Sequence, residues 1–507
     1  MELRPYQDQL IASLKDGWVN DGKRGLLQLP TGGGKTVIFS YVAMNTSKKG
    51  NRVLIISHRT ELLTQAGGTL REFGLDPYLI TADTKVIRDA SVYVAMVNTL
   101  KNRLKHDDWN EWLKSISLVI IDECHRSDFA WINPKCHKMG VTATPKRSGK
   151  MPQLSDEYDF MVLGPDVQEM INMGFLLPDR YYGVPVDISG VGYGSDGDYN
   201  TSEMFGRYNS TPIYKGVIDN WIKYANNTTT ICFCCNIQHC IQTTKELNEA
   251  GIKAKFLVSD VSKPKKPETD SKAAWTLYNR KMAEYENYKQ YYDLYSGDRE
   301  TIISEWKSGE FYILVNAGIL VEGFDHKPTQ TVIVLLSTTS ENKWLQMLGR
   351  GSRPSPSTGK EFFIILDFGC NADRLGHYRQ QRDYSLTHAE SKAVGVPASK
   401  ECPKCQALVV ASSRICKYCG FEFPKSAEEV VVELVAIEYA DKKPKQLDFK
   451  QLTFDQIEEY AKQRGYAKNW AWRTIYFSFG EEGLKAYAKK KGYHHSWVYQ
   501  QLRIFKK

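Results

Sequence analysis

A glycine-rich segment between two apolar runs places the strictest limit on what this chain folds into. Residues 29–36 read LPTGGGKT and lie between apolar runs at 26–27 and 37–39, which predicts a strand, a tight turn and the start of a helix. Successive glycine N–H groups and a helix N-terminus bind an anion. The phosphate-loop pattern has glycine where this chain has Leu29, so a glycine-rich surface turn remains the alternative. The expected phosphate-binding residues are Thr31, Gly32, Gly33, Gly34, Lys35 and Thr36, with the Thr36 hydroxyl on Mg²⁺.

Short apolar runs alternate with helical stretches through much of the chain. Near-continuous runs of branched residues separated by helices predict parallel sheets covered on both faces, an α/β fold. The expected strands are 53–56, 92–96, 118–121, 230–234, 313–316 and 332–336, and the expected helices include 61–73 and 240–250.

Polar side chains follow the expected strands where α/β sheets bind ligands. Asp122 and Glu123 end one apolar run; we expect Asp122 to hold Mg²⁺ and Glu123 to orient or deprotonate an attacking water, the alternative being a plain turn. Thr142 and Thr144 end the next run, where their hydroxyls can link a nucleotide site to a second domain. Gln7 precedes the glycine-rich segment, and its amide can pair with an adenine edge.

Two arginines three residues apart, Arg350 and Arg353, follow Gly349 and Ser352 respectively near the end of the second α/β pattern. Guanidinium is always charged and binds phosphate through two N–H groups. We therefore expect this pair to contact a γ-phosphate.

In order and spacing, these segments resemble motifs 0, I, II, III, V and VI of superfamily-2 helicases. The resemblance removes the difficulty at Leu29, because motif I of that family needs no glycine there. It implies two RecA-like domains with ATP in the cleft between them, and arginine fingers at Arg350 and Arg353. It also implies ATP contacts from Arg4, Gln7, Gly323 and Asp325, coupling through Thr142, Thr144 and Gln346, and nucleic-acid contacts from His58, Arg59, Asn98 and Thr99.

An aromatic stripe interrupts the second α/β pattern between residues 260 and 297. Aromatic and apolar residues recur there at steps of three and four, which predicts one helix from about 271 to 295. The stripe either packs on the domain or on another helix, or stacks on bases beside a nucleic-acid strand. Its members are Trp275, Tyr278, Met282, Tyr285, Tyr288, Tyr292 and Tyr295.

Two C-x-x-C pairs lie ten residues apart in the last quarter of the chain. Four thiolates at this spacing favour a closed, tetrahedral, structural Zn²⁺ site; iron and free thiols are the alternatives. The remaining thiols fit a reducing compartment, and we expect neither a membrane span nor a signal peptide. The four expected ligands are Cys402, Cys405, Cys416 and Cys419.

The C-terminal segment is basic and contains a repeat. Residues 442–507 hold 15 Lys/Arg and 6 Asp/Glu, a net charge of +9, whereas the whole chain carries +8. This asymmetry indicates a polyanionic partner or, alternatively, a solubilising tail. Tyr460, Gly465, Tyr466, Trp470 and Trp472 recur 27 positions later as Tyr487, Gly492, Tyr493, Trp497 and Tyr499. Each copy predicts a helix, a glycine turn and a second helix, whose aromatic residues stack on bases or form a small core.

The whole layout resembles the RadD-like branch of bacterial and phage superfamily-2 proteins. We expect RecA-like domains at 1–175 and 176–398, a zinc module at 399–424 and the repeat tail at 442–507. The resemblance implies a nucleic-acid-dependent ATPase and helicase acting in the bacterial cytoplasm or a phage-infected cell, on DNA rather than RNA, in replication, recombination or repair. A protein partner of the tail is also expected. The alternatives are a duplex-DNA translocase that does not separate strands and an ATP-switched nucleic-acid-binding scaffold.

Overall fold

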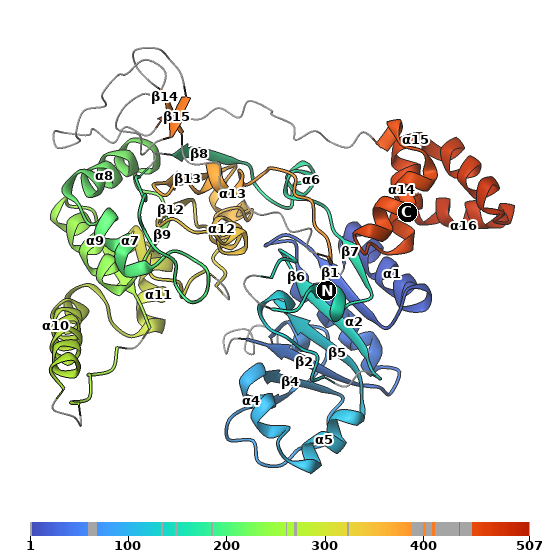
Figure 1. Ribbon diagram of the computed structural model, residues 1–507, viewed down its shortest axis with the longest axis horizontal. Coiled ribbons are helices and arrows are strands. Elements are labelled where there is room, and N and C mark those ends of the chain that lie inside the picture. The colour runs from blue at the N-terminus through green and yellow to red at the C-terminus, as the bar shows by residue number, and fades with distance from the viewer. Residues whose placement is uncertain are drawn as a thin grey trace. The chain divides into compact units, whose positions relative to one another are not determined.

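The protein consists of two compact units (Figure 1). The first unit comprises Met1–Met173, Gln381–Ser391 and Asp441–Lys507, and the second comprises Gly174–Gln380 and Lys392–Ala440. The chain thus passes between the two units four times and returns to the first unit for residues 441–507. The computed structural model describes residues 3–58, 68–132, 135–147, 151–183, 186–259, 261–267, 271–321, 324–387, 399–401, 408–410, 435–436 and 449–505.

The first unit is built on a parallel sheet with the strand order β3-β4-β2-β5-β6-β1-β7. Its strands are almost wholly buried because helices cover the sheet, as the continuous apolar runs predict. The strands are β1 (Arg24–Gln28), β2 (Arg52–Ser57), β3 (Tyr78–Ile80), β4 (Val92–Met96), β5 (Ile116–Asp122), β6 (His137–Thr142) and β7 (Phe160–Leu163). The helices are α1 (Pro5–Asn20), α2 (Lys35–Ser47), α4 (Val97–Arg103), α5 (Asp107–Lys114) and α6 (Val167–Asn172).

The second unit contains a sheet of order β10-β11-β9-β12-β13-β8-β16, parallel except for β16. The α/β class predicted for both halves is confirmed. The strands are β8 (Asp179–Gly183), β9 (Thr230–Cys234), β10 (Ala254–Leu257), β11 (Ile313–Asn316), β12 (Thr331–Leu335), β13 (Phe363–Asp367) and β16 (Val435–Ala436), and β14 (Ser399–Glu401) pairs with β15 (Leu408–Val410). The helices are α7 (Thr201–Tyr208), α8 (Thr211–Ala225), α9 (Ile237–Glu249), α10 (Lys272–Tyr295), α11 (Arg299–Ser308), α12 (Glu341–Leu348) and α13 (Asn371–Leu375).

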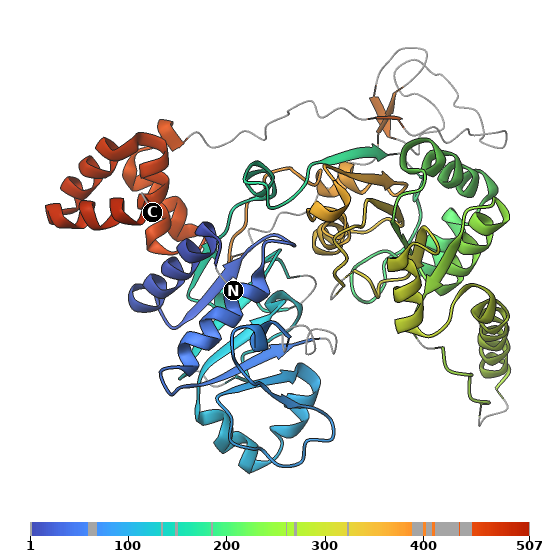
Figure 2. The same ribbon diagram turned by 180° about the vertical axis from the view of Figure 1, so that it is seen from behind.

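The aromatic stripe lies on α10, a helix that protrudes from the second unit (Figure 2). The helix prediction is confirmed, but most of the stripe is not core, because Tyr288 alone is buried among the α10 residues. Asn287 donates a hydrogen bond of 2.5 Å to Gln238 on α9. None of the helices in the described part of the chain is both long and apolar enough to cross a membrane.

The repeat tail packs on the first unit rather than forming a unit of its own. It consists of α14 (Phe454–Gln463), α15 (Lys468–Lys491), which kinks at Gly480, and α16 (His495–Phe505). Gly465 and Ala467 form backbone hydrogen bonds of 2.8 and 2.9 Å with Met161 on the edge strand β7. Arg473 on α15 donates a hydrogen bond of 2.6 Å to Ser13 on α1. The helix–turn–helix form of each repeat is confirmed, and the first copy is hydrogen-bonded to the sheet of the first unit.

Candidate functional site

The glycine-rich turn connects β1 to the first turn of α2, as its sequence predicts. Gly32 and Gly34 adopt φ angles of +87° and +82°, a region that side chains disfavour. Gly33 has no room for a side chain, because a Cβ there would lie 2.6 Å from Leu29 Cγ. Leu29 is fully buried and also fills the space beside Gly164. Leu29, which departs from the strict pattern, therefore packs against the turn at Gly33.

Helix α1 holds the turn from a second side. Tyr6 donates a hydrogen bond of 2.6 Å to the Gly33 carbonyl, and Gln7 Nε2 lies 3.4 Å from the same oxygen. Gln7 Oε1 accepts a hydrogen bond of 2.9 Å from the Arg4 backbone N–H. Burial raises the pKa of Tyr6, although Arg4 opposes the shift, so its hydroxyl remains a hydrogen-bond donor at neutral pH. Tyr6 is a contact that the sequence analysis did not single out.

The acidic pair at the end of β5 is connected to the threonines that follow β6. His125 Nδ1 lies 2.8 Å from Thr142 Oγ1 and 3.5 Å from Glu123 Oε2. Thr142 Oγ1 in turn accepts a hydrogen bond of 3.1 Å from the Thr144 backbone N–H. Glu123 itself has φ and ψ of +49°, a conformation that is uncommon for a residue with a side chain. One buried imidazole therefore joins the two predicted motifs within the first unit.

A buried ion pair fixes the backbone behind this acidic pair. Arg147 and Glu157 lie 2.7 Å apart with side chains 1% and 2% exposed. The Arg147 guanidinium also donates to the carbonyls of Cys124, at 3.3 Å, and Ser127, at 2.7 Å, on either side of the short turn that contains His125. Burial raises the pKa of Glu157, and Arg147 opposes that shift.

In the second unit, the two predicted arginines have different surroundings. Arg350 is buried and donates hydrogen bonds to the carbonyls of Val321, at 2.7 and 3.1 Å, and of Phe324. Arg353 forms an ion pair with Asp325, and its side chain is 18% exposed. Arg350 thus holds the loop after β11, whereas Arg353 is paired with a half-exposed carboxylate.

Residues 1–147 match the family model described as "Type III restriction enzyme, res subunit". A 51.5 kDa protein of a Lactococcus phage is 27% identical over 410 residues, which cover 78% of each chain. A protein of Saccharomyces cerevisiae, named as a candidate ATP-dependent helicase, IRC3, is 28% identical over 393 residues. The chain is an ATPase that is similar to superfamily-2 helicases, including subunits of restriction enzymes.

The match extends over both α/β units. A fragment of an HsdR-type type I restriction subunit from Vibrio vulnificus has the same fold, with a TM-score of 0.53 and 19% identity over 73% of this chain and 65% of that one. The EcoAI type I restriction endonuclease subunit of Escherichia coli is 25% identical, and the match covers 46% of its length. The chain spans about half the length of the yeast and E. coli relatives, 51% and 46% respectively.

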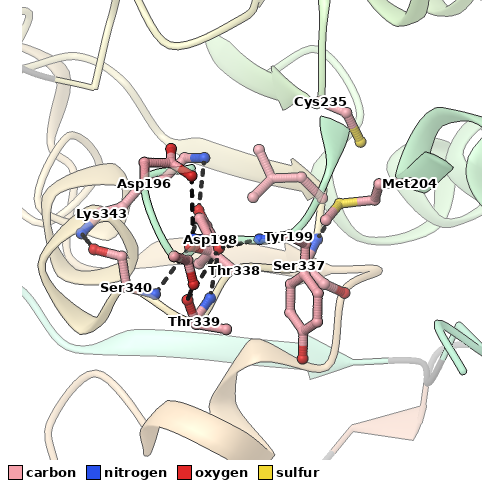
Figure 3. Close-up of polar contacts among 12 residues, drawn as sticks. Asp196, Asp198, Tyr199, Met204, Cys235, Ser337, Thr338, Thr339, Ser340 and Lys343 are labelled. Carbon is pink, nitrogen blue, oxygen red and sulfur yellow. Dashed lines mark hydrogen bonds and ion pairs between the residues drawn. The ribbon is translucent and has the colours of Figure 1, made fainter. Parts of the chain in front are cut away.

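A loop of the second unit contacts the start of α12, the helix that ends just before Arg350. Figure 3 shows Asp198 directed at the residues between β12 and α12. Its carboxylate accepts hydrogen bonds from Thr338 Oγ1, at 2.6 Å, and the Thr339 backbone N–H, at 2.8 Å, and lies 3.3 Å from Lys343 Nζ. Burial acts to raise the pKa of Asp198, but Lys343 and these hydrogen bonds outweigh it, so the pKa is lowered.

Lys360 is a second residue that the sequence analysis missed. Its amine lies 3.1 Å from the carbonyls of both Lys327 and Arg353 and also donates to the Gly351 carbonyl. Burial, with a smaller contribution from Arg353, lowers the pKa of Lys360 to about 7. This side chain therefore holds the backbone on both sides of Ser352.

The other predicted residues lie on different elements or outside the described residues. His58 follows β2, while Asn98 and Thr99 lie in the first turn of α4. Gln346 on α12 is buried, and neither of its amide atoms has a hydrogen-bond partner among the described residues. Arg59, Gly323, Cys402, Cys405, Cys416 and Cys419 lie outside the described residues.

The residues of the first unit fit a magnesium–nucleotide complex. Side chains are excluded from the turn at Gly33 and Gly34, where an added Cβ would collide with Leu29 and Gln7 respectively, and such a bare backbone is what phosphate binding requires. Lys35 Nζ lies 3.3 Å from the Leu29 carbonyl at the base of the turn. Asp122, 7% exposed, supplies the hard oxygen that Mg²⁺ prefers.

Proposed function

We propose that this superfamily-2 ATPase couples ATP hydrolysis to movement along DNA and unwinds single-stranded or branched substrates in replication, recombination or repair. The observation that supports coupling most directly is the His125 bridge between Glu123 and Thr142. A residue that touches both the acidic pair and the following threonines can transmit a change at the nucleotide to the rest of the motor.

In this proposal, Lys35, Thr36 and Asp122 hold the nucleotide with its Mg²⁺. The metal supplies positive charge that neutralises the phosphates and orients them. Glu123 accepts a proton from the attacking water, and Arg353 stabilises the charge that develops on the transferred phosphoryl group. We assign Arg350 a different role from the one that the family resemblance implies, because its guanidinium is occupied by backbone carbonyls.

DNA as the track is supported by charge and by relatives. The net charge of +9 on residues 442–507 attracts a polyanion. One relative is named as a restriction endonuclease subunit, which supports DNA over RNA. Contacts from His58, Arg59, Asn98 and Thr99 to the strand remain part of the proposal, as does nucleotide-dependent coupling through Gly323, Asp325 and Gln346.

Two other functions make different predictions. A translocase on duplex DNA would hydrolyse ATP on blunt duplexes without separating strands. A scaffold switched by ATP would bind nucleic acid while its hydrolysis rate stays independent of it. The complete set of acidic, threonine and arginine motifs favours a motor over the scaffold.

The deciding experiment measures the ATPase rate without nucleic acid and with single-stranded DNA, blunt duplex, forked DNA and RNA, each at two salt concentrations. We expect stimulation by single strands or forks that decreases with salt, together with strand displacement on forks. Equal stimulation by blunt duplex without displacement would support the translocase. No stimulation by any nucleic acid would refute the motor on DNA and favour the scaffold.

We further propose that Cys402, Cys405, Cys416 and Cys419 bind one structural Zn²⁺. Purified protein should contain one zinc per chain by elemental analysis, and a variant with Cys402 and Cys405 replaced by Ser should contain none. Unchanged zinc content in that variant would remove these two cysteines from the site.

A further inference from the structure

The two copies of the tail repeat have the same backbone but different surroundings. Gly465 and Gly492 have φ angles of +67° and +71°. Tyr466 and Tyr493 each donate a backbone hydrogen bond of 2.9 Å to the alanine five residues earlier. Tyr466 is 7% exposed, however, whereas Tyr493 is 45% exposed. The same turn is therefore covered in the first copy and open in the second.

What covers the first copy is a segment of this chain that lies outside its helices and strands. The Leu386 backbone N–H donates 3.1 Å to the Arg464 carbonyl, and the Thr387 hydroxyl donates 3.1 Å to the Gln463 carbonyl. The last carbonyls of a helix have no partner within it, and here the segment at residues 383–387 supplies their donors at the end of α14. Leu386 lies over Gly465, where an added Cβ would be 2.8 Å from its Cδ1.

An acidic residue completes this contact in the first copy. Asp383 accepts hydrogen bonds from Arg464 Nε, at 2.9 Å, and from the hydroxyl of Tyr466, at 3.1 Å. In the second copy, the residues equivalent to Tyr460 and Arg464 already share a carboxylate: Tyr487 donates 2.5 Å to Glu458, and Lys491 pairs with the same group. The second copy is thus fastened to the first through its helix, while its turn lies outside that contact.

The turn of the second copy keeps the features that bind a peptide in the first. A Cβ placed on Gly492 would meet no atom of the described residues within 4 Å, so the place that Leu386 occupies over Gly465 is open there. The stretch from residue 485 to residue 503 contains five Lys/Arg and no Asp/Glu. Three of these, Lys485, Lys490 and Lys491, form ion pairs with acidic residues of the tail, so the open space over Gly492 rather than charge distinguishes this turn.

From this comparison, we infer that the turn of residues 491–494 binds a segment of a partner protein, with a leucine-like side chain over Gly492. Polypeptide is favoured over nucleic acid because one of the equivalent carbonyls in the first copy, that of Arg464, accepts a main-chain N–H, from Leu386. A phosphodiester backbone has no such donors, and its oxygens are themselves acceptors. In this interaction, backbone N–H groups of the partner segment would donate hydrogen bonds to the exposed carbonyls at the end of α15.

The test uses the full chain and a fluorescein-labelled peptide of sequence EDYSLTE, which repeats residues 383–387 between two glutamates. We expect saturable binding by fluorescence anisotropy and no binding of the peptide EDYSDTE. Gly492→Asn places a side chain over the turn and should weaken binding at least about tenfold, because asparagine tolerates the left-handed conformation. Gly50→Asn is the matched control, since Gly50 also has a positive φ of +78° and open space around it in the first unit.

Both glycine variants should retain the wild-type melting temperature and ATPase rate. Absence of peptide binding, or equal binding by Gly492→Asn and wild type, would overturn the inference. If Gly492→Asn instead weakens binding of a 20-nucleotide oligothymidine while no peptide binds, the surface belongs to nucleic acid. If it converts a dimer into a monomer in size-exclusion chromatography, the occupant is a second copy of this chain. Either result would show that the turn of residues 491–494 binds something other than a partner protein.

Discussion

The buried pair Arg147–Glu157 allows a quantitative test of how the acidic motif is held in place. Replacing Arg147 by Met removes the ion-pair partner of a carboxylate that is 2% exposed, together with the hydrogen bonds to the carbonyls of Cys124 and Ser127. Breaking one side of a buried ion pair costs about 3–5 kcal/mol, because the remaining charge stays buried. Replacing both residues by apolar ones, Arg147→Met with Glu157→Leu, should restore most of the loss.

The assay is thermal unfolding of the full chain followed by tryptophan fluorescence. For a unit of this size, about 2–4 °C is lost per kcal/mol, so the Arg147→Met transition should lie about 6–20 °C below wild type. The deficit should shrink as the pH falls towards 5. Glu157 has a raised pKa in the folded chain, and it rises further without Arg147, so protonation on folding relieves the unpaired charge there. A loss below about 1 kcal/mol, or a double variant no more stable than Arg147→Met, would refute the reasoning.

Four further perturbations test other parts of the molecule. Lys35→Ala should abolish DNA-stimulated ATP turnover, and substantial activity would remove Lys35 from the site. Arg353→Ala should bind a fluorescent ATP analogue normally but hydrolyse ATP at least about 10³-fold more slowly; an unchanged rate would exclude its role. Folding lowers the pKa of Lys360 to about 7 from an ordinary 10.5. The free energy of unfolding of the wild type should therefore rise, relative to that of Lys360→Met, by up to about 1.4 kcal/mol per pH unit above 7. A difference in urea midpoint between the two proteins that is the same at pH 7 and pH 9 would contradict this. Asp198→Asn should destabilise the second unit by about 1–3 kcal/mol in the same urea assay, and no change in midpoint would show that the Lys343 contact is dispensable.

The strands and the glycine-rich turn were predictable because their signals are local. The apolar runs that form β2, β4, β5 and β9 are continuous in sequence, and the conformations of Gly32 and Gly34 follow from residue type. The family resemblance already allowed Leu29 at this position, but its packing against Gly33 was not predicted. A steric partner four residues away is within reach of sequence reasoning, but only once the turn geometry is known.

The contacts that were missed join residues far apart in the chain. Asp198 and Thr338 are separated by 140 residues, and no local pattern relates them. The repeat could be recognised in the sequence. The contacts of its first copy with Met161 and Leu386 could not be predicted, because they are made by backbone groups that every residue has. Likewise, the spacing of Arg350 and Arg353 predicts the same role for both. The two differ only in the structure, where the guanidinium of Arg350 donates hydrogen bonds to backbone carbonyls.

The return of the chain to its first unit has a consequence for biosynthesis. The edge of β7 is covered at Met161 by Gly465 and Ala467, which are made about 300 residues later and, at about 5–20 residues per second, about 15–60 s later. During that interval the nascent sheet has an uncovered edge strand, a site where chains pair wrongly with one another. A transcript that stops after the second unit would leave that edge permanently open. Residues made about 300 positions after Met161 thus complete the sheet of the first unit.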